Sequence, residues 1–335
     1  MIKAAVIGVG SMGRHHARVY NELEEAELVA VADADPDRAA KIARRYKVRP
    51  YTDYREMLER ERPDLVSIAV PTQFHHQVAL DVIERGMHLL IEKPIASTVE
   101  EARDIIRRAD ERGLKLAVGH VERFNPAVIE LKRRLERGEL GKVFLAHARR
   151  LGPFPERVRD MGVVIDLATH DLDVMCYLLG SEVERVYAET TRRIHTQYED
   201  LLSGLLRFKN GAIGVLDVNR LTPTKIRELT LTGERGMFVV NYLTQDLYFY
   251  ENDYAAGGWE NLGILKGVGE GNMIRLRIEK KEPLRVELES FVKAVANDGR
   301  PLVGGEDGLR ALVLAKQLVE SGRSGRVVEI GVVYR

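Results

Sequence analysis

The sequence predicts an α/β protein in which a doubly wound parallel sheet is followed by an α+β domain with an open, mainly antiparallel sheet. Three observations indicate this fold class. Six short apolar runs alternate with helical patterns over the first 120 residues, as parallel strands and their crossover helices do. A glycine-rich turn directly follows the first of these runs. Beyond about residue 186, alternating apolar and polar runs succeed one another with turns between them, which is typical of an antiparallel sheet.

The first domain, residues 1–121, is expected to contain six strands joined by five crossover helices. Its helix starts are predicted from capping residues, whose side chains accept hydrogen bonds from the amides of the first turn. Ser97 and Glu100, for example, match the capping-box pattern. The expected strands are Ile2–Ile7, Leu28–Asp33, Val48–Tyr51, Leu65–Val70, His88–Glu92 and Leu114–Gly119. The expected helices are Gly13–Leu23, Pro36–Tyr46, a segment capped by Asp53, His75–Gly86 and a segment from Ser97 to Gly113.

The second domain, residues 122–335, is expected to begin with two helices. The first runs from the cap Asn125 to Gly138, and the second spans Gly162–Leu179. Asn210-Gly211 is a hairpin signal within the strand-rich region. The expected strands are Val186–Thr190, Leu202–Phe208, Ala212–Val218, Ile226–Thr232, Gly236–Asn241 and Leu247–Tyr250. A mobile loop is expected over Tyr254–Gly271, followed by the helices Leu284–Asn297 and Gly308–Ser321 and a strand at Val327–Ile330.

Charge and composition exclude several classes of function. The 335-residue chain has 51 Lys and Arg against 51 Asp and Glu, so no overall basic surface for nucleic acid or an anionic membrane is expected. No apolar run reaches the roughly 18–20 residues that span a bilayer. Cys176 is the one cysteine, which excludes an internal disulfide and zinc motifs built on cysteine pairs. We therefore predict a cytoplasmic location and a small-molecule ligand.

The glycine-rich turn predicts a dinucleotide site. Gly8, Gly10 and Gly13 form a Gly-x-Gly-x-x-Gly pattern between a strand and a helix, and this context makes the short pattern specific for a Rossmann domain. The turn, which includes Ser11 and Met12, would place a pyrophosphate at the helix N-terminus.

Asp33 predicts which dinucleotide binds. It lies twenty residues after Gly13, at the end of the second strand, where a carboxylate can bind a ribose diol and repel a 2′-phosphate. Because the next residue, Ala34, adds no compensating charge, we expect NAD rather than NADP as the cofactor.

Three polar residues are candidates for the chemistry. Lys93 follows the fifth strand, on the edge where such sheets bind ligands, although a solvated loop lysine is the simpler interpretation of this residue alone. Asp166 and His170 lie at i and i+4 of a predicted helix, so the carboxylate can orient the imidazole for proton transfer near neutral pH. A helix-surface ion pair is an equally open interpretation. A metal site that adds Asp173 would lack further ligands, so no metal is expected.

In their order and spacing, these motifs resemble the Gfo/Idh/MocA family of NAD(P)-dependent sugar and polyol oxidoreductases over nearly the whole chain. The matching segments are the glycine turn, Pro71–His75, Glu92-Lys93-Pro94 and the series Gly162, Asp166 and His170. The resemblance implies a Rossmann domain and an open sheet with the substrate between them. It implies that Lys93 and His170 meet the reacting hydroxyl. It also implies cofactor contacts by Pro71, Thr72, His75, Glu92, Lys93 and Pro94.

Two further segments, Gly119–Val128 and Leu221–Glu234, resemble the UDP-N-acetylglucosamine 3-dehydrogenase branch of this family. This implies an NAD-dependent dehydrogenase that oxidises the C3 hydroxyl of a nucleotide sugar. Arg220 departs from the branch, where an aromatic residue is expected, and a cation there would suit an anionic substrate. The residues expected to bind substrate are Lys93, Arg123, Asp166, His170, Arg220 and Lys225. Two alternatives stay open, namely a free sugar or myo-inositol 2-dehydrogenase and a non-catalytic NAD-sensing regulatory protein.

The expected mechanism divides the work between two residues. His170, held by Asp166, removes the hydroxyl proton, and Lys93 stabilises the developing alkoxide. The family also admits lysine as the proton acceptor, so these roles can be exchanged. His16, just inside the first helix, is interpreted as structural.

An open sheet must cover its outer face, and this predicts a homodimer or homotetramer. The residues expected on that face are Leu229, Leu231, Phe238, Val240, Tyr248 and Tyr250.

Overall fold

A computed structural model describes residues 1–154, 161–194, 197–252 and 270–331. These residues divide into two compact units, of which the first contains residues 1–124 and 281–313. The second unit contains the described residues within 125–280 and 314–331. The loop expected over Tyr254–Gly271 lies almost entirely outside the described residues. In the described part of the chain, no helix is both long and apolar enough to cross a membrane.

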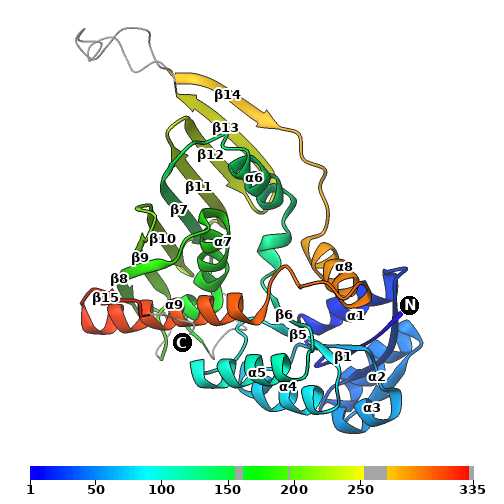
Figure 1. The fold of residues 1–335 in the computed structure, drawn as a ribbon. Helices are drawn as coiled ribbons and strands as arrows, with labels where there is room; N and C mark the ends of the chain where they lie inside the picture. Colours follow the sequence, from blue (N-terminus) through cyan, green and yellow to red (C-terminus); the bar gives the residue numbers. More distant parts are fainter. Residues whose placement is uncertain (155–160, 195–196, 253–269, 332–335) are drawn as a thin grey trace, which may run out of the picture. The chain divides into compact units, whose positions relative to one another are not determined.

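A six-stranded parallel sheet forms the middle of the first unit, as predicted (Figure 1). The strand order is β3-β2-β1-β4-β5-β6, so it reverses between β1 and β4. Doubly wound sheets bind ligands beside such a reversal, at the carboxyl ends of the strands. The strands are β1 (Ile2–Ile7), β2 (Ala26–Ala32), β3 (Arg49–Tyr51), β4 (Leu65–Ile68), β5 (His88–Glu92) and β6 (Leu116–Gly119).

Helices cover both faces of this sheet, and each face has its own apolar cluster. Val6 packs in one cluster and its neighbours Ala5 and Ile7 pack in the other, which explains why a strand buried on both faces is a continuous apolar run. The cluster of Val6 includes side chains from α1 (Gly13–Glu22), α2 (Pro36–Tyr46) and α8 (Pro283–Ala296). The other includes side chains from α3 (Tyr54–Glu61), α4 (His75–Glu84), α5 (Val99–Glu111) and the first part of α9 (Gly305–Ser324).

The first unit is not one continuous stretch of chain, because residues 281–313 belong to it. The expected division into 1–121 and 122–335 places this segment in the second domain, and the structure differs. The physical reason is the apolar face of α8, where Leu284, Leu288 and Phe291 recur at helical spacing and pack in the cluster of Val6. An amphipathic pattern predicts that a helix packs on a sheet, but it does not show on which one.

A nine-stranded sheet forms the second unit and is mainly antiparallel, as predicted (Figure 1). The order is β14-β13-β12-β11-β7-β10-β9-β8-β15, and within it β7 and β10 are parallel. Strand β7 was not predicted from the sequence. The strands are β7 (Val143–Leu151), β8 (Val183–Thr191), β9 (Leu201–Phe208), β10 (Ile213–Asn219), β11 (Ile226–Gly233), β12 (Gly236–Asn241), β13 (Asp246–Asn252), β14 (Glu270–Leu276) and β15 (Val328–Glu329).

One face of this sheet carries the core of the second unit. Side chains from α6 (Pro126–Glu136), α7 (Thr169–Leu179) and the C-terminal part of α9 pack on it. The prediction for the outer face is therefore wrong for four residues that lie in this core, namely Leu229, Leu231, Phe238 and Val240. Tyr248 and Tyr250 lie on the opposite face, because Phe249 between them packs against the core. Alternation along a strand shows which residues share a face, but not which face the helices cover.

Helix starts follow the predicted capping chemistry, with one shift. Asn125 caps α6, as expected. The capping box before α5 is formed by Thr98 and Glu101, one residue later than Ser97 and Glu100. Thr98 Oγ1 accepts a hydrogen bond from the Glu101 amide at 3.1 Å. Glu101 Oε2 in turn accepts from the amides of Ser97 and Thr98 at 3.0 and 3.1 Å, and this double contact moves the helix start.

Candidate active site

The glycine turn between β1 and α1 is shaped by close backbone contacts. Gly8 has a φ of 84°, and a Cβ atom there would lie 2.7 Å from the carbonyl oxygen of Ala69. A Cβ atom on Gly13 would lie 1.7 Å from the carbonyl oxygen of Gly8. At Gly10 the nearest atom, on Arg38, is 4.0 Å away. Packing therefore requires Gly8 and Gly13, whereas Gly10 leaves space through which a ligand can approach the backbone.

The N-terminus of α1 has the features of an anion site. Met12 occupies its N-cap position without a side-chain cap hydrogen bond, and the first turn holds no acidic residue. Ser11 and Met12 are exposed. The amides and the dipole of a helix N-terminus favour a negative group such as a phosphate. Together with the space at Gly10, this arrangement fits the pyrophosphate of a dinucleotide.

Asp33 is fixed at the carboxyl end of β2 by backbone contacts. Its Oδ2 accepts a hydrogen bond from the Val9 amide at 2.9 Å, and its Oδ1 accepts one from the Asp35 amide at 3.0 Å. The guanidinium of Arg38 lies 3.3 Å from Asp33 Oδ1 and 3.2 Å from Asp35 Oδ2. The carboxylate predicted to bind a ribose diol therefore has a cation beside it that the sequence analysis missed. The available signal was an arginine five residues after Asp33, on the first turn of the next helix.

Three predicted cofactor residues follow β4. Pro71 and Thr72 lead through the short 3-10 helix η1 (Thr72–Phe74) into α4, which begins at His75. His75 is buried, with Nδ1 2.9 Å from the Pro94 carbonyl oxygen and Nε2 2.9 Å from that of Val70. Burial lowers the pKa of His75, while the two carbonyl contacts oppose this shift. His75 therefore joins the end of β4 to the loop after β5, and its contact with a cofactor stays a prediction.

Lys93 directly follows β5, at the same carboxyl edge as the glycine turn, and its side chain is half-buried. The preceding residue, Glu92, is buried, and its Oε1 lies 2.9 Å from Nε2 of His16 in α1. Its Oε2 accepts a hydrogen bond from the Lys93 amide at 3.2 Å. Pro94 is buried beyond Lys93. The structure thus brings Glu92, Lys93 and Pro94 to the edge that holds the glycine turn.

Asp166 and His170 lie on a helix that is not regular. The sequence predicts one α-helix over Gly162–Leu179, but residues Val164–Ala168 form a π-helix (η3) and α7 begins at Thr169. A π-turn holds more residues than an α-turn, so the simple i and i+4 relation does not hold here. Such π-turns occur frequently at functional sites.

Arg220 binds Asp166 in the second unit. Its Nη2 donates to Asp166 Oδ2, and its Nη1 donates to the carbonyl oxygen of Met161 at 3.4 Å. The Arg220 side chain is 4% exposed. The cation that was expected to suit an anionic substrate is thus ion-paired with the carboxylate expected to orient His170.

The other two cations predicted to bind substrate differ in their surroundings. Arg123 in the first unit is 3% exposed, and its Nη2 lies 2.9 Å from Asp307 Oδ1. It also donates to the carbonyl oxygen of Leu302 at 3.3 Å. These contacts give Arg123 a structural role that the sequence did not predict. Lys225 is exposed, directly before β11.

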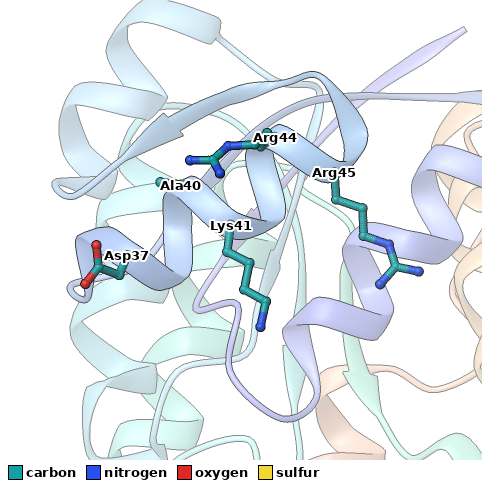
Figure 2. Close-up of a pocket in the computed structure, with 5 residues that line it drawn as sticks. All are labelled: Asp37, Ala40, Lys41, Arg44 and Arg45. Atoms are coloured by element: carbon teal, nitrogen blue, oxygen red, sulfur yellow. The ribbon is translucent and has the colours of Figure 1, made fainter.

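A separate hollow of about 470 Å³ lies along α2 (Figure 2). None of the predicted cofactor residues lines it. All of its lining residues come from one helix, so it is a charged surface of α2 and we assign it no ligand. The lining residues are Asp37, Ala40, Lys41, Arg44 and Arg45.

The fold and the residues at its carboxyl edge define an oxidoreductase with an NAD-binding Rossmann domain. Residues 2–120 match the oxidoreductase family with this fold, and residues 128–239 match the GFO/IDH/MocA C-terminal domain. The chain belongs to the Gfo/Idh/MocA family, as its motifs predict.

Relatives in this family are similar over almost the full chain. The UDP-N-acetylglucosamine 3-dehydrogenase of Acidithiobacillus ferrooxidans is 31% identical over 95% of this chain and 96% of its own. A solved structure of that enzyme matches with a TM-score of 0.86 at 30% identity, covering 96% of this chain and 98% of the other. The scyllo-inositol 2-dehydrogenase (NAD(+)) of Bacillus subtilis is 28% identical over 99% of this chain and 97% of its own.

Proposed function

We propose that the protein uses NAD to oxidise the C3 hydroxyl of a nucleotide sugar, UDP-N-acetylglucosamine, to a ketone. The observation that carries this proposal is the similarity to a UDP-N-acetylglucosamine 3-dehydrogenase, at 31% identity over nearly the whole of both chains. An inositol 2-dehydrogenase is almost as similar, at 28% identity. A dehydrogenase of inositol or of a free sugar is therefore the second candidate.

The cofactor in this proposal is NAD rather than NADP. Gly8, Gly10, Ser11, Met12 and Gly13 hold its pyrophosphate. Asp33 binds the ribose diol, and its carboxylate repels a phosphate at that position. A cofactor held by these residues would supply the hydride acceptor for the oxidation. The residues proposed to border the nicotinamide side are Pro71, Thr72, His75, Glu92, Lys93 and Pro94.

The residues of the chain handle the proton and the charge. His170 accepts the hydroxyl proton as general base, and Asp166 stabilises the resulting imidazolium. Lys93 donates a hydrogen bond to the hydroxyl oxygen and stabilises the negative charge that develops on it. The alternative assignment exchanges the two roles, so that Lys93 takes the proton.

The diphosphate of the substrate needs a cation. Among the cations predicted to bind substrate, Arg123 and Arg220 are buried in ion pairs with Asp307 and Asp166. Lys225 is exposed. We therefore assign the diphosphate contact to Lys225.

We further propose that the protein is a homodimer or homotetramer that covers the open face of the nine-stranded sheet. One row of side chains on this face crosses six strands, because each residue pairs with the next across the ladder. The row consists of Leu205, Val215, His147, Thr230, Val239 and Tyr248. A second row adds Met237, Tyr250 and Met273. These mostly apolar rows lie beside a polar row on the same face that contains Asp217, Arg149 and Glu228, and apolar side chains grouped in this way favour association.

The position of oxidation gives a direct test of the proposed reaction. UDP-N-acetylglucosamine that carries deuterium at C3 is incubated with the enzyme and NAD, and the NADH formed is analysed by mass spectrometry. The proposal predicts that the deuterium appears in NADH. NADH without deuterium would mean that another carbon is oxidised. Deuterium at C2 of myo-inositol, tested in parallel, would instead appear in NADH if the second candidate is correct.

A further inference from the structure

A buried polar network connects the glycine-turn helix to Glu92. Nδ1 of His16 in α1 lies 3.1 Å from Ser67 Oγ in β4, and Nε2 of His16 lies 2.9 Å from Glu92 Oε1. The hydroxyl of Tyr20, one turn further along α1, lies 2.8 Å from Ser67 Oγ. His16, Tyr20 and Ser67 have no exposed surface. The network therefore links α1, β4 and β5 in the interior of the first unit.

The network ends on a carboxylate, and this fixes the direction of one of its hydrogen bonds. A carboxylate only accepts, so His16 Nε2 donates to Glu92. Nδ1 of His16 and the hydroxyl of Tyr20 each share a hydrogen bond with the Ser67 hydroxyl. Burial raises the pKa of Tyr20, which keeps its hydroxyl protonated. Burial also opposes ionisation of Glu92, but the hydrogen bond from His16 and the charges of His16 and Lys93 outweigh it, so the pKa of Glu92 lies below its usual value.

The surroundings of Glu92 are built to accommodate its carboxylate. Gly119 pairs with Glu92 across β5 and β6, and a Cβ atom on Gly119 would lie 3.1 Å from Glu92 Oε2. Any larger residue at position 119 would press on this oxygen. Glu92 Oε2 accepts from the Lys93 amide, and His75 contacts the Pro94 carbonyl on the other side of Lys93. Buried side chains thus fix the backbone on both sides of Lys93.

We propose that Glu92 is a positioning residue for Lys93. His16 holds the carboxylate of Glu92, and this carboxylate fixes the backbone from which the Lys93 side chain extends. The position of Lys93 is thereby linked to α1, the helix proposed to bind the pyrophosphate. The inference rests on the proposed function, because it assigns Lys93 to the reacting hydroxyl. It goes beyond that function by giving the carboxylate of Glu92 and the imidazole of His16 a defined part in it.

Glu92→Gln is the variant that tests this most directly. It keeps the size of the side chain, but its amide cannot accept from both His16 and the Lys93 amide. We expect kcat to fall on the order of 10–100-fold, while the Kd for NAD changes by less than about threefold, because a small displacement of a reacting group costs rate rather than cofactor binding. Since His16 and Glu92 act as a unit, His16→Gln combined with Glu92→Gln should cost no more than the more severe single variant.

A matched control comes from a second histidine–carboxylate pair of the first unit. His76 Nε2 lies 3.0 Å from Asp104 Oδ2 on the outer helices. His76→Gln should leave kcat within about twofold, because this partly exposed pair touches none of the residues proposed to bind cofactor or substrate. The melting temperature of every variant, followed by circular dichroism, shows whether it is folded.

Three results would overturn the inference. They are a Glu92→Gln enzyme with unchanged kcat, a loss of NAD affinity equal to the loss of rate, and losses that multiply in the double variant. Failure of the proposed function appears separately, as a parent enzyme that oxidises no sugar.

In that case, the surroundings of Lys93 can be measured without substrate, by NMR of the protein with ¹³C-methylated lysines. The Lys93 signal, identified with Lys93→Arg, should shift in Glu92→Gln and stay in place in His76→Gln, and an unmoved signal in Glu92→Gln would contradict the positioning role.

Discussion

At the scale of single residues, we propose that Asp33 and Arg38 together govern the choice between NAD and NADP. Asp33→Ser removes the carboxylate that repels a 2′-phosphate and releases the Arg38 guanidinium from its partner 3.3 Å away. We expect the ratio of kcat/KM with NADP to kcat/KM with NAD to rise on the order of 10–100-fold, because a hydrogen bond to a charged group contributes about 1.5–3 kcal/mol. Steady-state kinetics with both cofactors measure this ratio.

The double variant Asp33→Ser, Arg38→Ala provides the control. It lacks both the repelling carboxylate and the attracting guanidinium, so the gain with NADP should largely disappear. An equal gain in the double variant would show that Arg38 does not bind the phosphate.

In the proposed mechanism, Arg220 supports catalysis through Asp166, with which it is ion-paired. Arg220→Met removes the guanidinium that binds Asp166 Oδ2, so the carboxylate is no longer held in place for His170. We expect kcat to fall on the order of 10–100-fold with the Kd for NAD unchanged, and Arg220→Lys to recover part of the loss. Arg235→Met is the matched control, because Arg235 bonds a backbone carbonyl, that of Gly138, at 3.1 Å. If Arg220→Met and Arg235→Met lowered kcat equally, the account of Arg220 would fail.

At the scale of elements, an ion pair joins α9 to the short helix η2 (Val121–Phe124). Burial raises the pKa of Asp307, but the charge and hydrogen bond of Arg123 and the charge of Arg310 outweigh it, so this pKa lies below its usual value. A lowered folded-state pKa stabilises the fold above the unfolded-state pKa, near 3.9 for Asp, and this stabilisation is lost as the pH falls through the folded-state value.

Asp307→Asn tests this linkage. At pH 7 it should lower the free energy of unfolding by about 2–3 kcal/mol, somewhat less than for a fully buried pair because part of Asp307 meets solvent. The difference from the parent should begin to shrink below about pH 4 and should disappear as the pH falls through the lowered folded-state pKa of Asp307, where the carboxyl group of the parent also becomes neutral. Urea unfolding at several pH values measures both. Glu56→Gln, which alters the exposed pair of Glu56 with Arg60, should cost at most about 1 kcal/mol. A difference that is constant with pH would contradict the linkage.

Strand β7 is an element that the pattern of apolar and polar residues does not predict. Its sequence, Val143–Leu151, contains a histidine and two arginines, which hide the alternation of apolar residues. One of these arginines, Arg150, is buried because Nε lies 2.6 Å from Asp171 Oδ2 and the guanidinium lies over the ring of Tyr242. Those partners are distant in sequence, so no local pattern could predict that the charge would be compensated.

The candidate site likewise contains some residues that a local motif predicts and others whose contacts it does not predict. The three glycines and Asp33 belong to a local motif, so their spacing was sufficient to place them at one edge of the sheet. The pair of His16 and Glu92 joins residues 76 positions apart, and the pair of Asp166 and Arg220 joins residues 54 apart. Such contacts depend on which strands become neighbours, and composition and periodicity do not contain that information.

At the scale of the whole molecule, the open face of the nine-stranded sheet predicts association. Leu205 is 49% exposed and pairs with Val215 in the row that crosses this face. Leu205→Glu with Val215→Glu should therefore reduce the mass measured by light scattering from a dimer or tetramer to the 37.8 kDa of a monomer, because buried carboxylates without partners oppose association. Leu243→Glu, in the turn between β12 and β13, should leave the mass unchanged. A monomeric parent would rule out the proposed interface.

The central claim is that a nucleotide sugar is the substrate, and a single-turnover measurement tests it most directly. Enzyme and NAD are mixed in equal amounts with UDP-N-acetylglucosamine, glucose or myo-inositol, and NADH absorbance is recorded, so that an unfavourable ketone equilibrium cannot hide the reaction. The account predicts NADH with the nucleotide sugar and none with the other two. NADH with glucose or myo-inositol alone would retain the family and the catalytic residues but contradict the proposed substrate.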